Sequence, residues 1–166
     1  FMDDPDAIRG NSLYRDEYSG DDVMAIILDT FNDNENALWF STTPTGVRFD
    51  WAVANDAQIG TDFRGAINRS WNTFWDVATH QDDQGWYAEM RIPFSSLRFQ
   101  DDNGRVVMGM ATYRFIATKN ERHLFPDNPP DWSLGWAKAS IAQDIVMDGV
   151  FSKRPVYLTP YVLGGA

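Results

Sequence analysis

The sequence contains no cysteine at any of its 166 positions. Disulfide bonds, zinc sites built on thiolates and thiol-based catalysis are therefore excluded. No apolar run approaches the ~20 residues that a membrane-spanning helix needs, and the first residues do not form a signal peptide. Because Phe1-Met2 does not resemble a natural start, we expect this chain to be an excerpt of a longer protein.

Basic residues are also scarce, with 14 Lys and Arg against 24 Asp and Glu and a net charge of −10. This balance argues against a nucleic-acid partner, which needs a positive face to neutralise phosphates, and against polybasic attraction to anionic lipid. The acids form four clusters beside turn residues, for which we predict solvated loops. These clusters are Asp3/Asp4/Asp6, Asp16/Glu17/Asp21/Asp22, Asp82/Asp83 and Asp101/Asp102.

Catalytic motifs are missing as well. The two histidines, His80 and His123, belong to no His-Glu-x-x-His motif and are predicted to lie in loops, and there is no Gly-x-Ser-x-Gly elbow. A triad that includes His123 stays open, because triads assemble in space. Among 24 acids, no carboxylate pair for glycoside hydrolysis can be singled out. The sequence favours a non-catalytic chain and leaves an enzyme open.

The dominant pattern in the sequence is the alternation of apolar and polar residues, with a period of two. In Gly85–Phe99, Trp86, Ala88 and Met90 fall on one face of a predicted strand, which Pro93 ends. Further predicted strands are Val23–Asp29, Ala37–Thr42, Val47–Val53, Thr73–Ala78, Val106–Thr118 and Trp136–Val146. Val23–Asp29 is apolar on both faces, which predicts a central strand covered on both sides. Short turns join the first three of these strands, which predicts a meander. Between the later strands we predict a polar turn over Thr79–Gly85 and a long loop over Lys119–Leu134. Many short strands without a convincing amphipathic helix predict an all-β, antiparallel β-sandwich.

Four segments, taken in their order along the chain, carry a resemblance to a known family. They are Asp22–Asp33, Thr45–Asp50, Gly85–Phe99 and Tyr113–Glu121. In this order they resemble the family 9 carbohydrate-binding-module-like domain at the front of certain bacterial outer-membrane β-barrel proteins. The resemblance covers about Asp3 to Leu163 and implies a jelly-roll-like sandwich.

The resemblance also implies a domain organisation and a place in the cell. Residues 1–150 would form the module, without its first strands, and residues 151–166 a linker into a barrel or a closing strand. The partner would be the C-terminal outer-membrane barrel of the same protein. The location would be extracytoplasmic, in the periplasm or outer membrane of a Gram-negative bacterium.

The seven tryptophans direct attention to sugar binding, because flat aromatic rings stack on the apolar C–H faces of pyranoses. Trp39, Trp51 and Trp86 lie in strands and are predicted to be core residues. The predicted ligand-binding residues are Trp71 and Trp132 for stacking, with Arg114, Asn120 and Arg122 as hydroxyl partners. The leading hypothesis is non-catalytic glycan recognition. The alternatives are a structural or docking module without sugar binding and, less favoured, a hydrolase.

One turn offers oxygen ligands for a metal. Asp29, Asp33 and Asn34 could ligate Ca²⁺, although their spacing does not match an EF-hand loop. The sequence requires no cofactor, and Ca²⁺ is an optional one.

Overall fold

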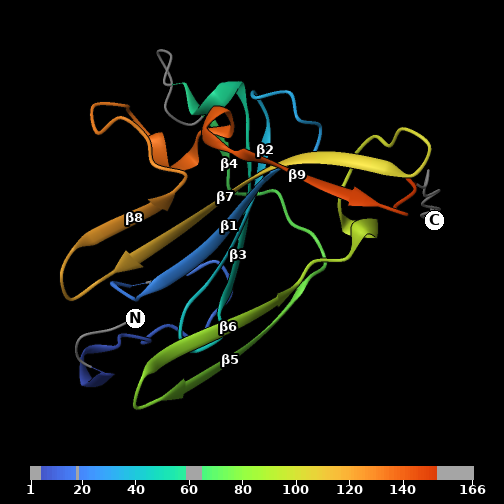
Figure 1. Cartoon of the computed structure of the whole chain (residues 1–166). Coiled ribbons are helices and arrows are strands. Elements are labelled where there is room, and N and C mark those ends of the chain that lie inside the picture. The colour runs from blue at the N-terminus through green and yellow to red at the C-terminus, as the bar shows by residue number, and fades with distance from the viewer. Residues whose placement is uncertain (1–4, 18, 59–64, 153–166) are drawn as a thin grey trace, which may run out of the picture.

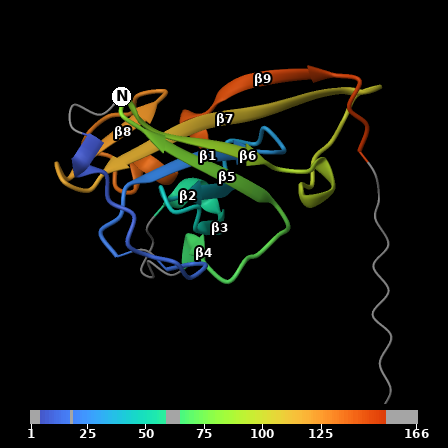
Figure 2. The same ribbon diagram turned by 90° about the horizontal axis from the view of Figure 1, so that it is seen from below.

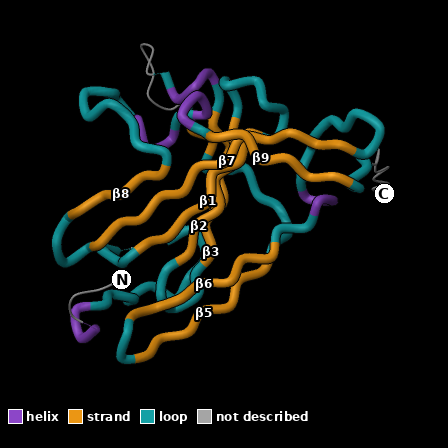
Figure 3. Tube along the Cα trace, in the orientation of Figure 1, coloured by secondary structure: helices purple, strands orange, loops and turns teal. Residues whose placement is uncertain are grey.

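Antiparallel β-strands build the part of the chain that the computed structural model describes, residues 5–17, 19–58 and 65–152. In order these are β1 (Val23–Asp29), β2 (Ala37–Thr42), β3 (Arg48–Val53), β4 (Ile67–Asn68), β5 (Asp76–Asp82), β6 (Gly85–Arg91), β7 (Arg105–Ile116), β8 (Glu121–Phe125) and β9 (Gln143–Asp148). Helical structure in this part is limited to short 3₁₀ turns of three residues each (Figure 3). No helix of these residues has the length and apolarity to cross a membrane.

The larger sheet has seven strands in the order β4-β3-β2-β1-β7-β8, and β9 pairs with the remaining length of β7 (Figure 1). The consecutive strands β1, β2 and β3 form the meander that the short turns between them predict. The strand predicted at Val23–Asp29 lies at the centre of this sheet, which explains why it is apolar on both faces. The all-β, antiparallel prediction is confirmed at this level.

The hairpin of β5 and β6 forms the second sheet. Its alternation is as predicted on β6, where Trp86 is buried and Tyr87 exposed. The predicted turn over Thr79–Gly85 is wrong, because Asp82 pairs with Gly85 and only two residues separate the strands. The polar residues of β5 suit a strand whose end projects into solvent, so they do not mark a loop. His80 accordingly lies in β5, stacked on Tyr87, instead of in a loop.

Two predictions in the last third of the chain are also corrected. The predicted loop over Lys119–Leu134 contains β8, which pairs with the end of β7 and places His123 in a strand. Most of β8 faces solvent at the sheet edge, so it lacks the apolar alternation that marks a strand. The predicted strand over Trp136–Val146 begins only at Gln143. Before it, two 3₁₀ turns, Gly135–Ala137 and Ala139–Ile141, fold across the sheet.

Apolar side chains fill both faces of the larger sheet. On one face, Trp75 and Leu97 pack against Leu28, Phe40 and Met108, so the β5–β6 hairpin and its flanking segments form a second layer (Figure 2). On the other face, the turns over 55–57 and 135–141 cover the half of the sheet that carries Ile27, Trp39 and Trp51. The candidate site lies on the same face at the edge of this cover, where Trp39 and Trp51 line it together with residues that the turns leave uncovered.

Two acids that were predicted to lie in a solvated loop are buried instead. Asp21 and Asp22 are 0% and 2% exposed. The carboxylate of Asp21 accepts hydrogen bonds from the backbone N–H groups of Asn11, Ser12 and Ser19, and that of Asp22 accepts one from Ala117. These carboxylates hold the N-terminal segment against the sheet, and a buried acid is tolerated because its lone pairs are satisfied.

This arrangement predicts a loss of stability in acid. Burial alone raises the pKa of Asp21, but the hydrogen bonds from Asn11, Ser12 and Ser19 outweigh it, and the pKa is lowered. A carboxyl whose pKa is lower in the folded state stabilises the fold above its unfolded pKa of about 3.9, and this contribution is lost as the pH falls through the folded pKa. We expect the urea midpoint to drop on going from about pH 5 to about pH 3, and less so in Asp21→Asn. Asp83→Asn, in the exposed turn between β5 and β6, is the control and should retain the full drop.

At the C-terminal end of the described chain, Phe151 packs on Gly104. A Cβ at Gly104, which has a φ of 87°, would lie 2.6 Å from the ring of Phe151, so this contact requires glycine. The Asp101 carboxylate also accepts a hydrogen bond from the backbone N–H of Ser152. The predicted linker or closing strand over 151–166 lies outside the described residues from 153 onward.

Candidate functional site

A trough runs across the half of the sheet that the 3₁₀ turns leave uncovered. The register places Phe49, Ser41, Ala25 and Tyr113 side by side on β3, β2, β1 and β7. The two central residues of this row are small and the two outer ones are aromatic. Because neighbouring side chains on one face of a sheet stand side by side, the row has a low middle and high walls.

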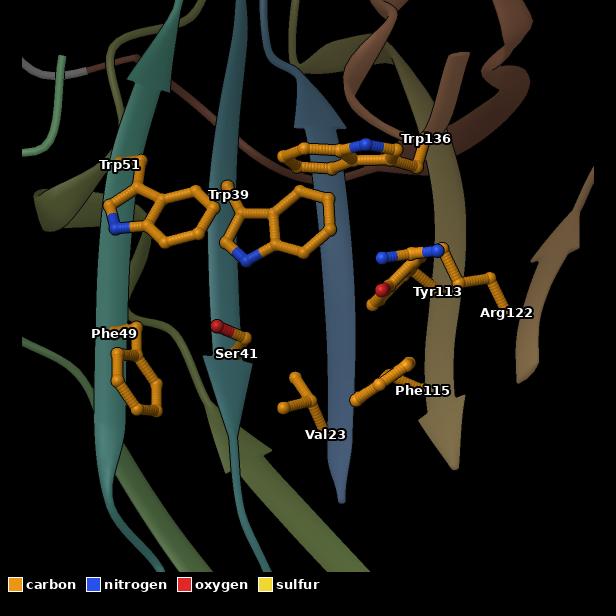
Figure 4. A pocket seen from close by; sticks show the side chains of 9 residues that line it. All are labelled: Val23, Trp39, Ser41, Phe49, Trp51, Tyr113, Phe115, Arg122 and Trp136. Atoms are coloured by element: carbon orange, nitrogen blue, oxygen red, sulfur yellow. The ribbon is translucent and has the colours of Figure 1, made fainter. Parts of the chain in front are cut away.

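This trough is the floor of a pocket with a volume of about 200 Å³. Most of its lining residues are aromatic, and these rings and one arginine rise around smaller side chains (Figure 4). The lining consists of Val23, Trp39, Ser41, Phe49, Trp51, Tyr113, Phe115, Arg122 and Trp136. The volume is below the ~300–1,000 Å³ of pockets for drug-sized ligands, so it suits a small ligand or one residue of a larger one.

The aromatic walls are held in fixed orientations by one another. Trp39 and Trp51 lie opposite each other on β2 and β3, stacked with centroids 5.5 Å apart and an interplanar angle of 18°. Trp136 meets Trp39 edge-on at 5.1 Å and 81°, and Tyr113 is 5.1 Å from Trp39. Trp39 and Trp51 are 2% and 7% exposed, so the prediction that they are buried is confirmed. Their buried rings also line the pocket, which their assignment to the core did not anticipate.

Trp136 is positioned by polar contacts between Asp56 and the residues that follow Trp136 in its loop. The Asp56 carboxylate accepts hydrogen bonds from the backbone N–H of Ser140 at 2.9 Å and from the Ser140 hydroxyl at 2.8 Å. The Lys138 ammonium, which is largely buried, pairs with the same carboxylate at 3.2 Å. Three contacts from Lys138 and Ser140 to one acid anchor the chain directly after Trp136, which helps to hold Trp136 over the sheet.

Polar groups at the pocket are few and are mostly donors. Arg122 pairs in register with Phe115 and places its guanidinium 5.4 Å from the centroid of that ring. On the opposite side, the guanidinium of Arg69 lies 5.0 Å from the centroid of Trp51. The indole nitrogen of Trp39 is buried and has no hydrogen-bond partner among the described residues.

The five predicted ligand-binding residues are not brought together. Arg122 lines the pocket. Trp71 lies on the opposite face of the sheet, where it packs edge-on against Phe40 at 5.9 Å and 77°. Trp132 is 42% exposed and lies 5.5 Å from the Lys138 ammonium, outside the pocket lining. Arg114 alternates with the pocket residues of β7 and therefore points to the other face, and Asn120 lies in the exposed β7–β8 turn.

The predicted Ca²⁺ ligands are engaged with the backbone of their own turn. The Asp29 carboxylate accepts hydrogen bonds from the N–H groups of Asp33 and Asn34, at 3.2 and 2.7 Å. The Asp33 carboxylate in turn accepts from Glu35 and Asn36. Within the described ranges, no group of three or more His, Cys, Asp or Glu side chains could hold a metal ion. The arrangement has the chemistry of a hydrogen-bonded turn, and metal binding there stays a prediction.

The arrangement supports binding better than reaction chemistry. None of the described lining residues is an acid or a histidine, so the pocket does not contain the carboxylate pair that glycoside hydrolysis uses. Sequence reasoning missed Phe49, Tyr113 and Trp136 as pocket residues. The available signal was the pair of small residues, Ala25 and Ser41, among aromatic neighbours, but it becomes visible only once the register is known.

Comparison of the chain with protein-family models, with curated proteins and with solved structures gives no match.

Proposed function

We propose that this chain is a non-catalytic glycan-binding module, in which the aromatic pocket holds one sugar ring. The observation that carries the proposal is the trough itself, whose small central residues lie between aromatic walls on β3 and β7. A pyranose presents flat C–H faces to such walls, and its hydroxyls can bond the polar groups at the rim. The buried floor supplies rigidity, and the half-buried Tyr113, Phe115 and Trp136 supply accessible ring surface.

The finer fold assignment belongs to the same proposal. A seven-stranded sheet covered on one face by a hairpin is consistent with a β-sandwich of the carbohydrate-binding-module type. The resemblance in Asp22–Asp33, Thr45–Asp50, Gly85–Phe99 and Tyr113–Glu121 supports a role as the extracytoplasmic module of a bacterial outer-membrane protein. The barrel of that protein would then be its partner in the same chain.

The test is a screen of plant, algal and bacterial cell-wall glycans, followed by calorimetric titration of each glycan that binds. We expect Tyr113→Ala to weaken binding at least about tenfold, as removal of a central aromatic contact does. Tyr113→Phe retains the ring and should retain most of the affinity.

The matched control is Trp132→Ala, which removes an exposed tryptophan of the same loop as Trp136 that lies outside the pocket lining. We expect this variant to bind as the parent does. Absence of any glycan binding, or a loss confined to Trp132→Ala, would contradict the proposal. Intrinsic fluorescence and the urea midpoint establish that each variant is folded.

A further inference from the structure

The charge at the aromatic pocket has the opposite sign to the charge of the chain. The sequence carries 24 acids and 14 basic residues, yet no Asp or Glu occurs among the described lining residues and Arg122 does. A second arginine, Arg69, lies over Trp51 on the far side of the trough, 5.0 Å from the ring centroid. The two guanidinium groups therefore flank the same strip of aromatic rings.

The hydrogen-bonding capacity of Arg122 is unused within the described part of the chain. Its guanidinium lies over the ring of Phe115, and no side-chain hydrogen bond or ion pair joins it to another described residue. Other arginines form ion pairs with acidic neighbours. Arg48 pairs with Asp76 at 3.5 Å, and Arg105 pairs with Asp148 at 3.8 Å. A guanidinium that rests on a ring keeps its N–H edges free, because those donors lie in the guanidinium plane.

Figure 4 shows where these donors lie. The guanidinium of Arg122 reaches from β8 across β7 toward Tyr113, at the rim of the pocket. On the floor, the indole nitrogen of Trp39 is on the ring edge that faces Ser41. This N–H is buried without a partner in the described chain, and an unsatisfied buried donor is costly unless a ligand or water accepts from it.

We infer that the pocket selects an acidic sugar, a uronate whose exocyclic carboxylate is bound by Arg122. This inference rests on the proposed glycan binding and adds the chemical class of the ligand. The planar fork of an arginine matches a carboxylate in two parallel hydrogen bonds, and the fork keeps its charge at every working pH. Aromatic walls lower the local dielectric and strengthen this contact. The Trp39 N–H, a donor only, takes a further ligand oxygen.

The experiment compares pairs of oligosaccharides that differ only in charge. Oligogalacturonate and oligomannuronate are titrated against the parent chain beside their fully methyl-esterified forms, by calorimetry at about 0.15 M salt, where repulsion from the distant acids is screened beyond about 8 Å. For the oligosaccharide that fits the pocket, we expect the acid to bind about five- to tenfold more tightly than the ester. This factor is what a charge-assisted hydrogen bond contributes at a partly exposed rim. A sulfated galactan and its desulfated form test whether the pocket prefers a sulfate group, the other common anion of glycans.

Variants of Arg122 assign this preference to the pocket. Arg122→Gln should remove the acid-over-ester preference, so that acid and ester bind with affinities within about twofold of each other. Arg122→Lys keeps the charge but not the fork, and should recover only part of the preference. Arg91→Gln, an exposed change on β6 with the same loss of charge, should leave the preference as it is.

The outcomes separate this inference from the proposed function. Equal binding of acid and ester, binding of neutral glycans alone, or a preference that survives Arg122→Gln would overturn the acidic ligand and leave glycan binding standing. A preference for the sulfated over the desulfated galactan that equals or exceeds the preference for acid over ester would overturn the assignment to a carboxylate. Binding of no glycan in any pair or in the wider screen would overturn both.

Discussion

Trp75→Ala is expected to lower the free energy of unfolding by about 3–5 kcal/mol, as for other large aromatic residues truncated in a core. Trp75 is 0% exposed and meets Phe40 edge-on at 5.5 Å and 80°. It precedes β5 and is part of the apolar cluster between the hairpin layer and the larger sheet. Since a domain of this kind is stabilised by only about 5–15 kcal/mol, we expect a large drop in the urea midpoint.

Two further variants separate loss of packing from other effects. The indole nitrogen of Trp75 is buried without a hydrogen-bond partner in the described chain. Trp75→Phe removes this donor and keeps a ring, so it should cost no more than about 1.5 kcal/mol. Phe74→Ala removes the neighbouring side chain, which is 67% exposed, and should change stability by less than about 0.5 kcal/mol. Similar losses for Phe74→Ala and Trp75→Ala would contradict the assignment of Trp75 to the interlayer core.

Arg15→Met is expected to lower the free energy of unfolding by about 3 kcal/mol, the lower end of the range for removing one partner of a buried ion pair. The Asp50 side chain is 0% exposed, pairs with the guanidinium of Arg15 and accepts a hydrogen bond from the backbone N–H of Thr73 at 2.6 Å. Without Arg15, the buried carboxylate keeps, among the described residues, only the hydrogen bond from Thr73. The lower end applies because the Arg15 side chain is 30% exposed and water can reach it.

The double variant Arg15→Met/Asp50→Asn provides the check. The side-chain amide that replaces the Asp50 carboxylate can still accept from Thr73 but carries no buried charge, so we expect at least half of the lost stability to return. Unfolding in urea at about pH 7 measures both variants. A loss below about 1 kcal/mol in Arg15→Met, the value of exposed ion pairs, would show that Asp50 does not depend on Arg15 in solution.

Local patterns in the sequence predicted the longer strands that pack against other elements on at least one face, but not the two-residue β4, whose residues they assigned to an irregular segment. The turn residues on either side placed β2 within its observed limits, and continuous apolarity identified β1 as central. The same reasoning failed at β8, where Glu121, Arg122 and His123 face solvent and show no apolar period. It failed again at Trp136–Ala142, because the apolar residues there cover a sheet face from a pair of 3₁₀ turns.

The pocket depended on information that no single segment carries. Neighbouring residues in the sequence predict a tryptophan to be core where they are apolar and exposed where they are polar. This criterion favours Trp71 and Trp132 as ligand-binding residues and assigns Trp39 and Trp51, which are both buried and at the pocket, to the core alone. A residue can belong to the core and still present an edge to a cavity when its neighbour on the next strand is small.

The sequence by itself determined that the chain forms antiparallel β-structure, that β1 lies inside the sheet and that no thiol chemistry is possible, because each follows from composition or from periods of a few residues. Only the tertiary structure decided which aromatic rings surround a cavity and which arginines stand beside it. Those facts depend on the register among β3, β2, β1, β7 and β8, and register is set by contacts between residues far apart in the chain.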